Sequence, residues 1–196
     1  MPLTWLVVTA LAASCSPSVA SPTLAAVAKV ESGFDPLAIG VNGTTRQQLH
    51  PANLADAIST ATRLLKAGRN IDLGLAQINS DNLGRLGLSV GRAFDACANL
   101  EASGRVLLTA YAGAPARGDG TGLAVLQALS VYNTGRADRG FRNGYVAKVA
   151  TAAAALPNLP LAAPPARPAP PAWDVFAQAA TNISFVMTPA PPGETP

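Results

Sequence analysis

One glutamate lies on the side of a predicted helix that otherwise carries apolar residues. Leu24 and Val27 precede Glu31 by seven and four positions, so a helix through this segment turns the three side chains toward one face. Glu31 would also occupy the last turn, where unpaired carbonyl groups oppose a negative charge. Burial opposes that charge too, so we expect a raised pKa and a carboxyl group that can donate a proton to a leaving oxygen. The alternative is a carboxylate that turns from the helix end into solvent.

Two further segments carry polar groups that suit contact with a sugar. The segment DLGLAQIN contains Gln77 and Asn79, whose amides both donate and accept hydrogen bonds, as recognition of an N-acetyl sugar requires. The segment SVYNTG brings Tyr132 and Asn133 to the end of a predicted helix. Each segment is weak evidence alone, because Asn and Gly at a helix end are commonly a helix cap.

The elements that position these groups are predicted to be helices. Ser21 and Pro22 are typical of an N-cap and a first helical residue. Gly33 can end the same helix in a left-handed turn. Glu31 should therefore lie in a helix over about residues 22–32.

The remaining pattern predicts a mainly α fold. Asn99 is interpreted as the N-cap of a helix that turns Leu100, Leu107, Leu108 and Tyr111 toward the core. Apolar spacing predicts further helices, over residues 53–67, 123–132 and 145–156. Between Ile39 and Ile78 we expect at most a short β ribbon.

Composition excludes several classes of function. The chain has 196 residues, of which 49% are hydrophobic and 13% charged, with a net charge of +3. This composition suits one globular domain, and its scattered Lys and Arg residues give little support to nucleic-acid binding. One His and two Cys cannot make a standard zinc site, so we expect neither a metal nor another cofactor.

Both ends of the chain differ from the predicted domain. Residues 3–13 form an apolar run that is too short for an ordinary membrane span. Residues 1–20 are therefore either a signal peptide or an N-terminal core helix. Residues 156–196 are proline-rich and are predicted to form a flexible tail. If the protein is exported and Cys15 is retained, Cys15 and Cys97 can form a disulfide; the alternative is two buried thiols.

Taken in order, the polar segments resemble a known family. Glu31-Ser32-Gly33, the run GLAQIN and Tyr132-Asn133 resemble the three sequence motifs of the lysozyme-like lytic transglycosylases. The longer runs VESGFDPLAIGVNG and ALSVYNTG resemble the transglycosylase subunit of type IV secretion systems. The resemblance covers roughly residues 15–150, and we expect a domain over residues 15–155. It departs from the family at Ala76, where methionine is usual.

The resemblance implies a lysozyme-like α fold of the goose-type or soluble lytic transglycosylase kind. It also implies an exported, periplasmic enzyme that cleaves the β-1,4 bond between N-acetylmuramic acid and N-acetylglucosamine in peptidoglycan, leaving a 1,6-anhydro product. Glu31 would be the sole acid and base. Gln77 and Asn79 would line the sugar subsites, and Ser32 would fix the helix end. Tyr132 and Asn133 would hold either the substrate or the Glu31 carboxyl group.

Two alternatives stay open at this stage. Asp72 is the only other carboxylate beside a motif, and as a base for water it would make the enzyme a hydrolytic lysozyme. Such an aspartate more often holds a loop by accepting hydrogen bonds. The second alternative is a wall-binding assembly factor without required catalysis, whose tail residues Trp173 and Phe176 dock onto components of a secretion system.

Overall fold

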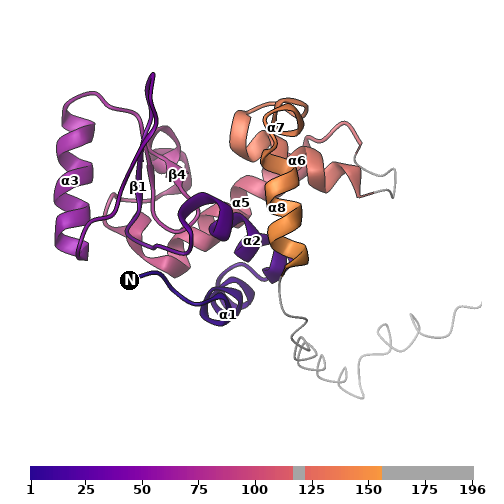
Figure 1. Cartoon of the computed structure of the whole chain (residues 1–196), viewed down its shortest axis with the longest axis horizontal. Helices are drawn as coiled ribbons and strands as arrows, with labels where there is room; N and C mark the ends of the chain where they lie inside the picture. Colours follow the sequence, from indigo (N-terminus) through magenta and orange to yellow (C-terminus); the bar gives the residue numbers. More distant parts are fainter. Residues whose placement is uncertain (117–121, 156–196) are drawn as a thin grey trace, which may run out of the picture. The chain divides into compact units, whose positions relative to one another are not determined.

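The helix that carries Glu31 lies at the centre of the domain. The computed structural model describes residues 1–116 and 122–155. In it, α2 (Ser21–Ser32) is buried along seven of its 12 residues. The helices α1 (Trp5–Cys15), α5 (Ala96–Ala112) and α8 (Tyr145–Ala154) pack against it, as Figure 1 shows. A helix that is apolar on most sides must be covered on most sides, so α2 is held firmly.

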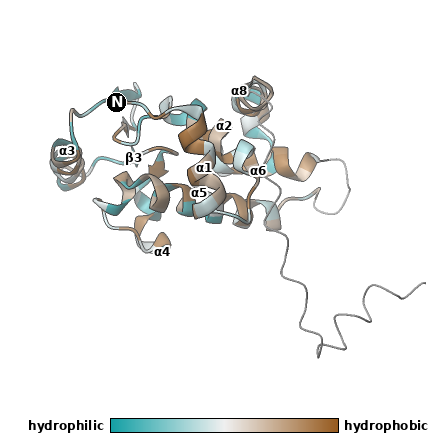
Figure 2. Cartoon of the chain, turned by 90° about the horizontal axis from the view of Figure 1, so that it is seen from below, coloured by the Kyte–Doolittle hydropathy of each residue, from teal (hydrophilic) through white to brown (hydrophobic). Residues whose placement is uncertain are grey.

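The other helices are shorter or lie farther from the centre. An amphipathic helix, α3, carries both hydrophilic and hydrophobic residues (Figure 2). Two very short helices, α4 and α7, connect longer elements, and α6 packs against α5. Their bounds are α3 (Leu54–Lys66), α4 (Leu83–Leu86), α6 (Leu123–Thr134) and α7 (Arg139–Arg142), with the 3-10 helices η1 (Ser80–Asn82) and η2 (Arg92–Phe94).

A small antiparallel sheet stands beside the helices. Its strands are β1 (Ile39–Val41), β2 (Gln47–Leu49), β3 (Ile71–Leu73) and β4 (Ile78–Asn79), in the order β2-β1-β3-β4. The mainly α prediction is confirmed, but the expected ribbon is a four-stranded sheet. Strands of two or three residues are too short to show an alternating pattern in the sequence.

The core has two parts that share α5. One part joins α1, α2, α6 and α8 through residues such as Leu24, Val27 and Leu100. The other part joins the sheet and α3 through residues such as Ile39 and Ile71. Because α5 contributes to both, it fixes the sheet relative to the helices.

Two predicted caps were wrong. Ala20, not Ser21, precedes the first residue of α2, although Gly33 ends that helix in the left-handed conformation at φ 65°, as predicted. Asp95 caps α5 by accepting a hydrogen bond from the Ala98 amide. Asn99 instead lies inside the helix and is fully buried.

The predicted inward face of α5 was also partly wrong. Leu100 and Leu107 are buried, as predicted, but Leu108 and Tyr111 are each about 40% exposed. The sequence analysis started this helix at Asn99, and the structure starts it at Ala96. A core-facing stripe assigned from only part of a helix is easily displaced to a neighbouring face.

The N-terminal segment forms α1, whose residues Val8 and Ala12 are buried. Cys15 at its end forms a disulfide with Cys97 on α5, across 82 residues of sequence. Removal of residues 1–20 as a signal peptide stays a prediction. No helix among residues 1–116 and 122–155 is both long and apolar enough to cross a membrane. The predicted tail, residues 156–196, lies outside the described residues.

Candidate active site

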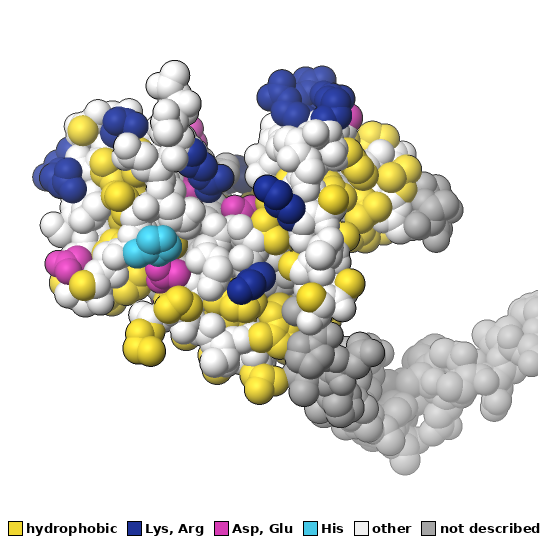
Figure 3. Space-filling model, viewed as in Figure 1, with side chains coloured by type: hydrophobic (Ala, Val, Ile, Leu, Met, Phe, Trp, Pro, Cys, Tyr) yellow, Lys and Arg dark blue, Asp and Glu magenta, His cyan; other side chains and the backbone are white. Residues whose placement is uncertain are grey.

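Glu31 lines a polar cleft of about 280 Å³. The acid lies in the last turn of α2, and the other side chains come from the sheet and its connecting turns, η1, α5 and α6. Figure 3 shows a hollow between the part that carries α3 and the sheet and the part that carries α6 to α8. The cleft is lined by Glu31, Asn42, Arg46, Asp72, Gln77, Ile78, Asn79, Asn82, Val106, Tyr132 and Asn133. The structure therefore brings the three predicted segments together.

A tyrosine that the sequence analysis did not select holds the acid. The Tyr145 hydroxyl donates a hydrogen bond of 2.7 Å to Glu31 Oε1. Tyr145 is the first residue of α8 and is only 6% exposed. A buried tyrosine hydroxyl needs a partner, but the partner here is 114 residues away, so local sequence gave no sign of it.

Burial raises the pKa of Glu31 from its usual value of 4.5 to about 7. The Tyr145 hydrogen bond and the Arg46 charge act in the opposite direction, whereas the Asp72 charge raises the pKa further. Burial also raises the pKa of Tyr145, so its hydroxyl stays protonated and remains a donor. Near neutral pH a large share of Glu31 therefore carries its proton, as the sequence analysis predicted.

Ser32 ties the end of α2 to the second motif. Its hydroxyl donates a hydrogen bond of 2.6 Å to the Leu75 carbonyl oxygen. Leu75 follows Gly74, which has a φ of 76° and where a Cβ would collide with the Ala93 carbonyl oxygen. Only glycine fits this turn. The hydrogen bond from Ser32 to Leu75 then fixes the distance between the turn and Glu31, the residue before Ser32.

Gln77 braces the same turn and keeps one polar atom free. Its side-chain nitrogen donates to the carbonyl oxygens of Ala38, at 3.1 Å, and Gly74, at 2.9 Å. The residue adopts a φ of 51°, which is uncommon for a side chain of this kind. Gln77 Oε1 is buried and has no hydrogen-bond partner among the described residues. A buried acceptor of this kind points to water or a ligand as its partner.

The sheet presents a row of polar residues on one face. Strand pairing places Gly40 opposite Asp72, and Asp72 opposite Asn79. Directly paired residues share a face of a sheet. Their neighbours Ile39 and Leu73 form the next pair and are fully buried, so the alternation of the strands turns the polar row away from the core.

Asp72 is held by hydrogen bonds at both carboxylate oxygens. Asn79 donates to Oδ1 at 2.7 Å, Asn42 donates to Oδ2 at 3.0 Å, and Arg46 approaches Oδ2 at 3.4 Å. Asn79 also exchanges hydrogen bonds with Asn70. Asp72 thus has the geometry of a residue that fixes neighbouring strands and the turn before β2.

The third motif contacts the second motif and not the acid. The Tyr132 hydroxyl donates to the Ala76 carbonyl oxygen at 2.7 Å, and Asn133 Oδ1 accepts from Asn143 at 2.9 Å. Of the two roles expected for Tyr132 and Asn133, holding the Glu31 carboxyl group is taken by Tyr145. Both residues still line the cleft.

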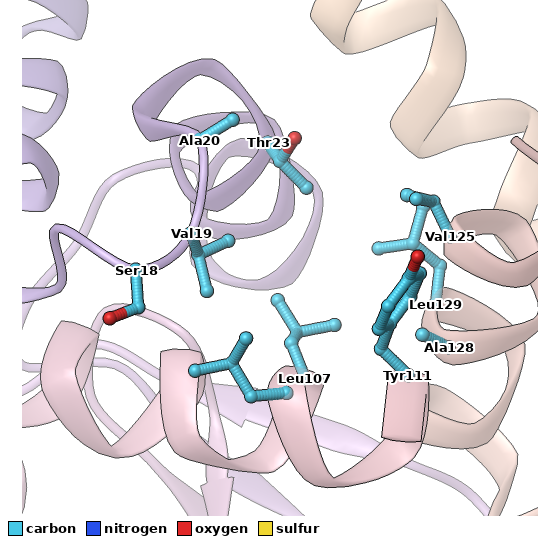
Figure 4. A pocket seen from close by; sticks show the side chains of 10 residues that line it. Ser18, Val19, Ala20, Thr23, Leu107, Tyr111, Val125, Ala128 and Leu129 are labelled. Carbon is cyan, nitrogen blue, oxygen red and sulfur yellow. The ribbon is translucent and has the colours of Figure 1, made fainter. Parts of the chain in front are cut away.

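A second cavity lacks groups suited to acid chemistry. It measures about 220 Å³ and lies between α5, α6 and the segment before α2. Figure 4 shows Val19 facing Leu107, with Tyr111 and Val125 at the other side. The lining holds no carboxylate. In the described part of the chain, no three His, Cys, Asp or Glu residues are grouped as metal ligands would be.

Comparison with known proteins places the chain in a family. The transglycosylase SLT domain family matches residues 9–154. The chain is 48% identical over 146 residues to "Protein virB1" of Rhizobium radiobacter, which covers 74% of this chain and 60% of the relative. It is 45% identical over 152 residues to "Protein virB1" of Agrobacterium fabrum, covering 78% of this chain and 61% of the relative.

A third relative carries a more descriptive name. The "Type IV secretion system protein virB1" of Brucella abortus is 40% identical over 149 residues, which cover 73% of this chain and 62% of the relative. The chain thus spans about 60% of the length of the curated relatives it matches. No solved structure matches it significantly. Since the family match extends over most of its length, the chain belongs to the transglycosylase SLT domain family.

Proposed function

We propose that this protein is a lytic transglycosylase with a lysozyme-like fold that cleaves the β-1,4 bond between N-acetylmuramic acid and N-acetylglucosamine in peptidoglycan. One observation carries the proposal: a sheltered Glu31, held by the Tyr145 hydroxyl, lies in a cleft lined with amide groups. Burial raises the pKa of Glu31 to about 7, which suits a group that must both give and take a proton.

The reaction has two proton transfers at one side chain. Protonated Glu31 donates its proton to the glycosidic oxygen, and the bond from that oxygen to the anomeric carbon breaks. The substrate's N-acetyl group stabilises the positive charge that develops on the muramyl ring. The Glu31 carboxylate then takes the proton of the muramyl 6-hydroxyl as its oxygen attacks the anomeric carbon. A 1,6-anhydro ring forms, no water is consumed, and Glu31 is protonated again.

The state of Asp72 favours this route over hydrolysis. A hydrolytic lysozyme with a second carboxylate needs that group free to act as a base or nucleophile. Glu31 and Asp72 are the two carboxylates among the described residues that line the cleft. Both oxygens of Asp72 already accept hydrogen bonds from Asn42, Asn79 and Arg46. We therefore assign Asp72 to positioning.

Three amides are suited to hold the sugar. Gln77 Oε1 can accept from an N-acetyl N–H, because the atom lacks a partner among the described residues. Asn79 lines the cleft from β4, and Asn133 lines it from α6. Together they line opposite sides of the cleft, as expected for a chain of sugar units.

We also propose that the enzyme acts in the periplasm and opens the cell wall locally for a type IV secretion or conjugation apparatus. The name of the Brucella relative supports this role. The disulfide between Cys15 and Cys97 suits an oxidising compartment. Recruitment by Trp173 and Phe176 concerns residues outside the described part of the chain and stays a prediction.

Mass analysis of digested peptidoglycan tests the reaction. We expect 1,6-anhydro ends from the wild-type protein and no cleavage by Glu31→Gln. Ordinary reducing ends would instead identify a hydrolase. Cleavage by a folded Glu31→Gln variant would remove the assignment of the acid, and a folded wild-type protein without any activity would favour a wall-binding assembly factor.

A further inference from the structure

The turn before β2 brings a cation to the cleft. Arg46 directly precedes β2 (Gln47–Leu49). It is the only Lys or Arg among the described residues that line the cleft. Its side chain is 48% exposed, so the guanidinium group is accessible to a ligand.

The guanidinium group lies in the same corner as the unpaired Gln77 acceptor. A Cβ built on Gly40 would come within 3.2 Å of Arg46 Nη2 and 2.7 Å of Gln77 Oε1. Because Gly40 has no side chain, both groups can lie close to the backbone of β1 and to each other. A ligand in this corner would meet a hydrogen-bond acceptor and a positive charge side by side.

Asp72 orients Arg46 without using all of its donors. The one hydrogen bond between them joins Nη2 to Asp72 Oδ2 at 3.4 Å, which is long for a charge-assisted bond. A guanidinium group has five N–H donors in a fixed plane. Most of its donor capacity thus stays available to a second acceptor.

An anionic ligand would meet Arg46 before it meets Asp72. The Asp72 side chain is 13% exposed, against 48% for Arg46, and its oxygens are covered by Asn42 and Asn79. Repulsion from Asp72 is weakened by those bonds, while Arg46 extends farther toward solvent. The balance favours a negative group at this end of the cleft.

The arginines that follow the third motif, Arg136, Arg139 and Arg142, are less suited to this role, because none of them lines the cleft. Arg136 and Arg142 both pair with Asp138. The sequence analysis left Arg46 unassigned, because a lone arginine in a polar loop carries no pattern. Only the folded sheet shows that Arg46 lies in the same cleft as Glu31.

We propose that Arg46 binds a carboxylate of the substrate and makes the enzyme selective for acidic glycan strands. This inference rests on the proposed function and deepens it. Guanidinium and carboxylate groups match in plane and charge. In peptidoglycan such a carboxylate belongs either to the peptide on the muramyl residue or to the lactyl group left when that peptide is removed.

Three preparations of one peptidoglycan separate these sources. Native strands keep their peptide carboxylates. Strands amidated with a carbodiimide and ammonia have peptides without free carboxylates, and strands treated with an amidase that removes the peptides keep only lactyl carboxylates. Cleavage is measured as kcat/KM for each preparation, with the wild-type protein, Arg46→Gln, Arg46→Lys and Arg63→Gln. Arg63 is an exposed residue of α3 that does not line the cleft. Arg63→Gln is therefore a control that removes the same charge as Arg46→Gln, but away from the cleft.

We expect Arg46→Gln to lower kcat/KM by roughly 3- to 10-fold on native strands, the range for a partly exposed charged contact, and to leave amidated strands nearly unaffected. Arg46→Lys should recover part of the loss, and Arg63→Gln should match the wild type. A loss on amidase-treated strands would identify the lactyl carboxylate, and a loss confined to native strands would identify the peptide.

Two results would overturn the role of Arg46. An equal loss on native and amidated strands would mean that Arg46 acts only through its neighbours Asp72 and Glu31. No loss on any of the three preparations would mean that Arg46 does not bind the substrate. Binding of the strands to Glu31→Gln, with and without Arg46→Gln, gives the same comparison without cleavage. Neither outcome affects the proposed function, which depends on the wild-type protein producing anhydro ends.

Discussion

Replacing the proposed acid should stabilise the protein while it abolishes cleavage. Glutamine keeps the size of Glu31 and can still accept the hydrogen bond from Tyr145. It cannot carry the charge that burial disfavours. Buried ionisable groups in active sites often lower the stability of the folded protein. The stability of Glu31→Gln therefore tests whether the Glu31 carboxyl group is buried, and not only whether it is needed for cleavage.

The magnitude follows from the pKa of Glu31, which burial raises from 4.5 to about 7. At about 1.4 kcal/mol per pH unit, this rise corresponds to an upper limit of about 3 kcal/mol. Between these two pH values the folded protein holds a proton that the unfolded chain has already lost. Unfolding then releases a proton, so wild-type stability falls as the pH rises from about 4.5 to 7 and levels off above that.

Urea unfolding at several pH values between 4 and 8 measures this difference. We expect Glu31→Gln and the wild type to differ least near pH 4 and the variant to be more stable by about 1 to 3 kcal/mol at pH 8. Glu101→Gln is the control, because Glu101 is exposed on α5. If the wild type and Glu31→Gln keep the same difference at every pH, the carboxyl group is not sheltered and the mechanism loses its physical basis.

Two further substitutions test the groups around the acid. Tyr145→Phe removes the hydrogen bond that holds the Glu31 carboxyl group, so kcat should fall by about tenfold. The same hydrogen bond lowers the pKa of Glu31, so the decline of kcat/KM at high pH should move to still higher pH. An unchanged pH profile would contradict this. Asp72→Asn removes a charge that raises the pKa of Glu31, so the same decline should begin at lower pH while the products keep their 1,6-anhydro ends. Loss of a hydrolytic product in Asp72→Asn would show that Asp72 activates water.

The sequence predicted the helix of Glu31 and the raised pKa of its carboxyl group because the relevant signals are local. Three apolar-face positions and a helix-ending Gly33 lie within ten residues of each other. The segments DLGLAQIN and SVYNTG were likewise each predicted from their own local sequence, and both contribute side chains to the cleft. What folding adds is the distance between them, such as the hydrogen bond from Ser32 to Leu75.

The parts that sequence could not predict depend on long-range contacts. Tyr145 was placed only as the start of a helix, because its partner Glu31 is remote in the chain. Asn99 has the residue type of a cap, yet it is buried and bonds the Ala76 amide and the carbonyl oxygens of Leu73 and Ala93. Such a role requires three separate segments to meet, and no local pattern records that meeting.

We expect substrate binding and acid catalysis to be coupled through the charges around Glu31. Tyr145 on α8, Arg46 before β2, Asp72 on β3 and Tyr132 on α6 interact with it, and the Arg46 charge lowers its pKa. A substrate carboxylate bound to Arg46 would offset that charge, so the pKa of Glu31 should be higher in the complex than in the free enzyme. The pH at which kcat declines reports the complex, whereas kcat/KM reports the free enzyme. For native strands the decline of kcat should therefore lie at higher pH than that of kcat/KM, and for amidated strands the two should nearly coincide. Equal separations for both substrates would show that the anion does not reach Arg46, and the pKa of Glu31 would then depend only on burial and on the charges and hydrogen bonds of the protein itself.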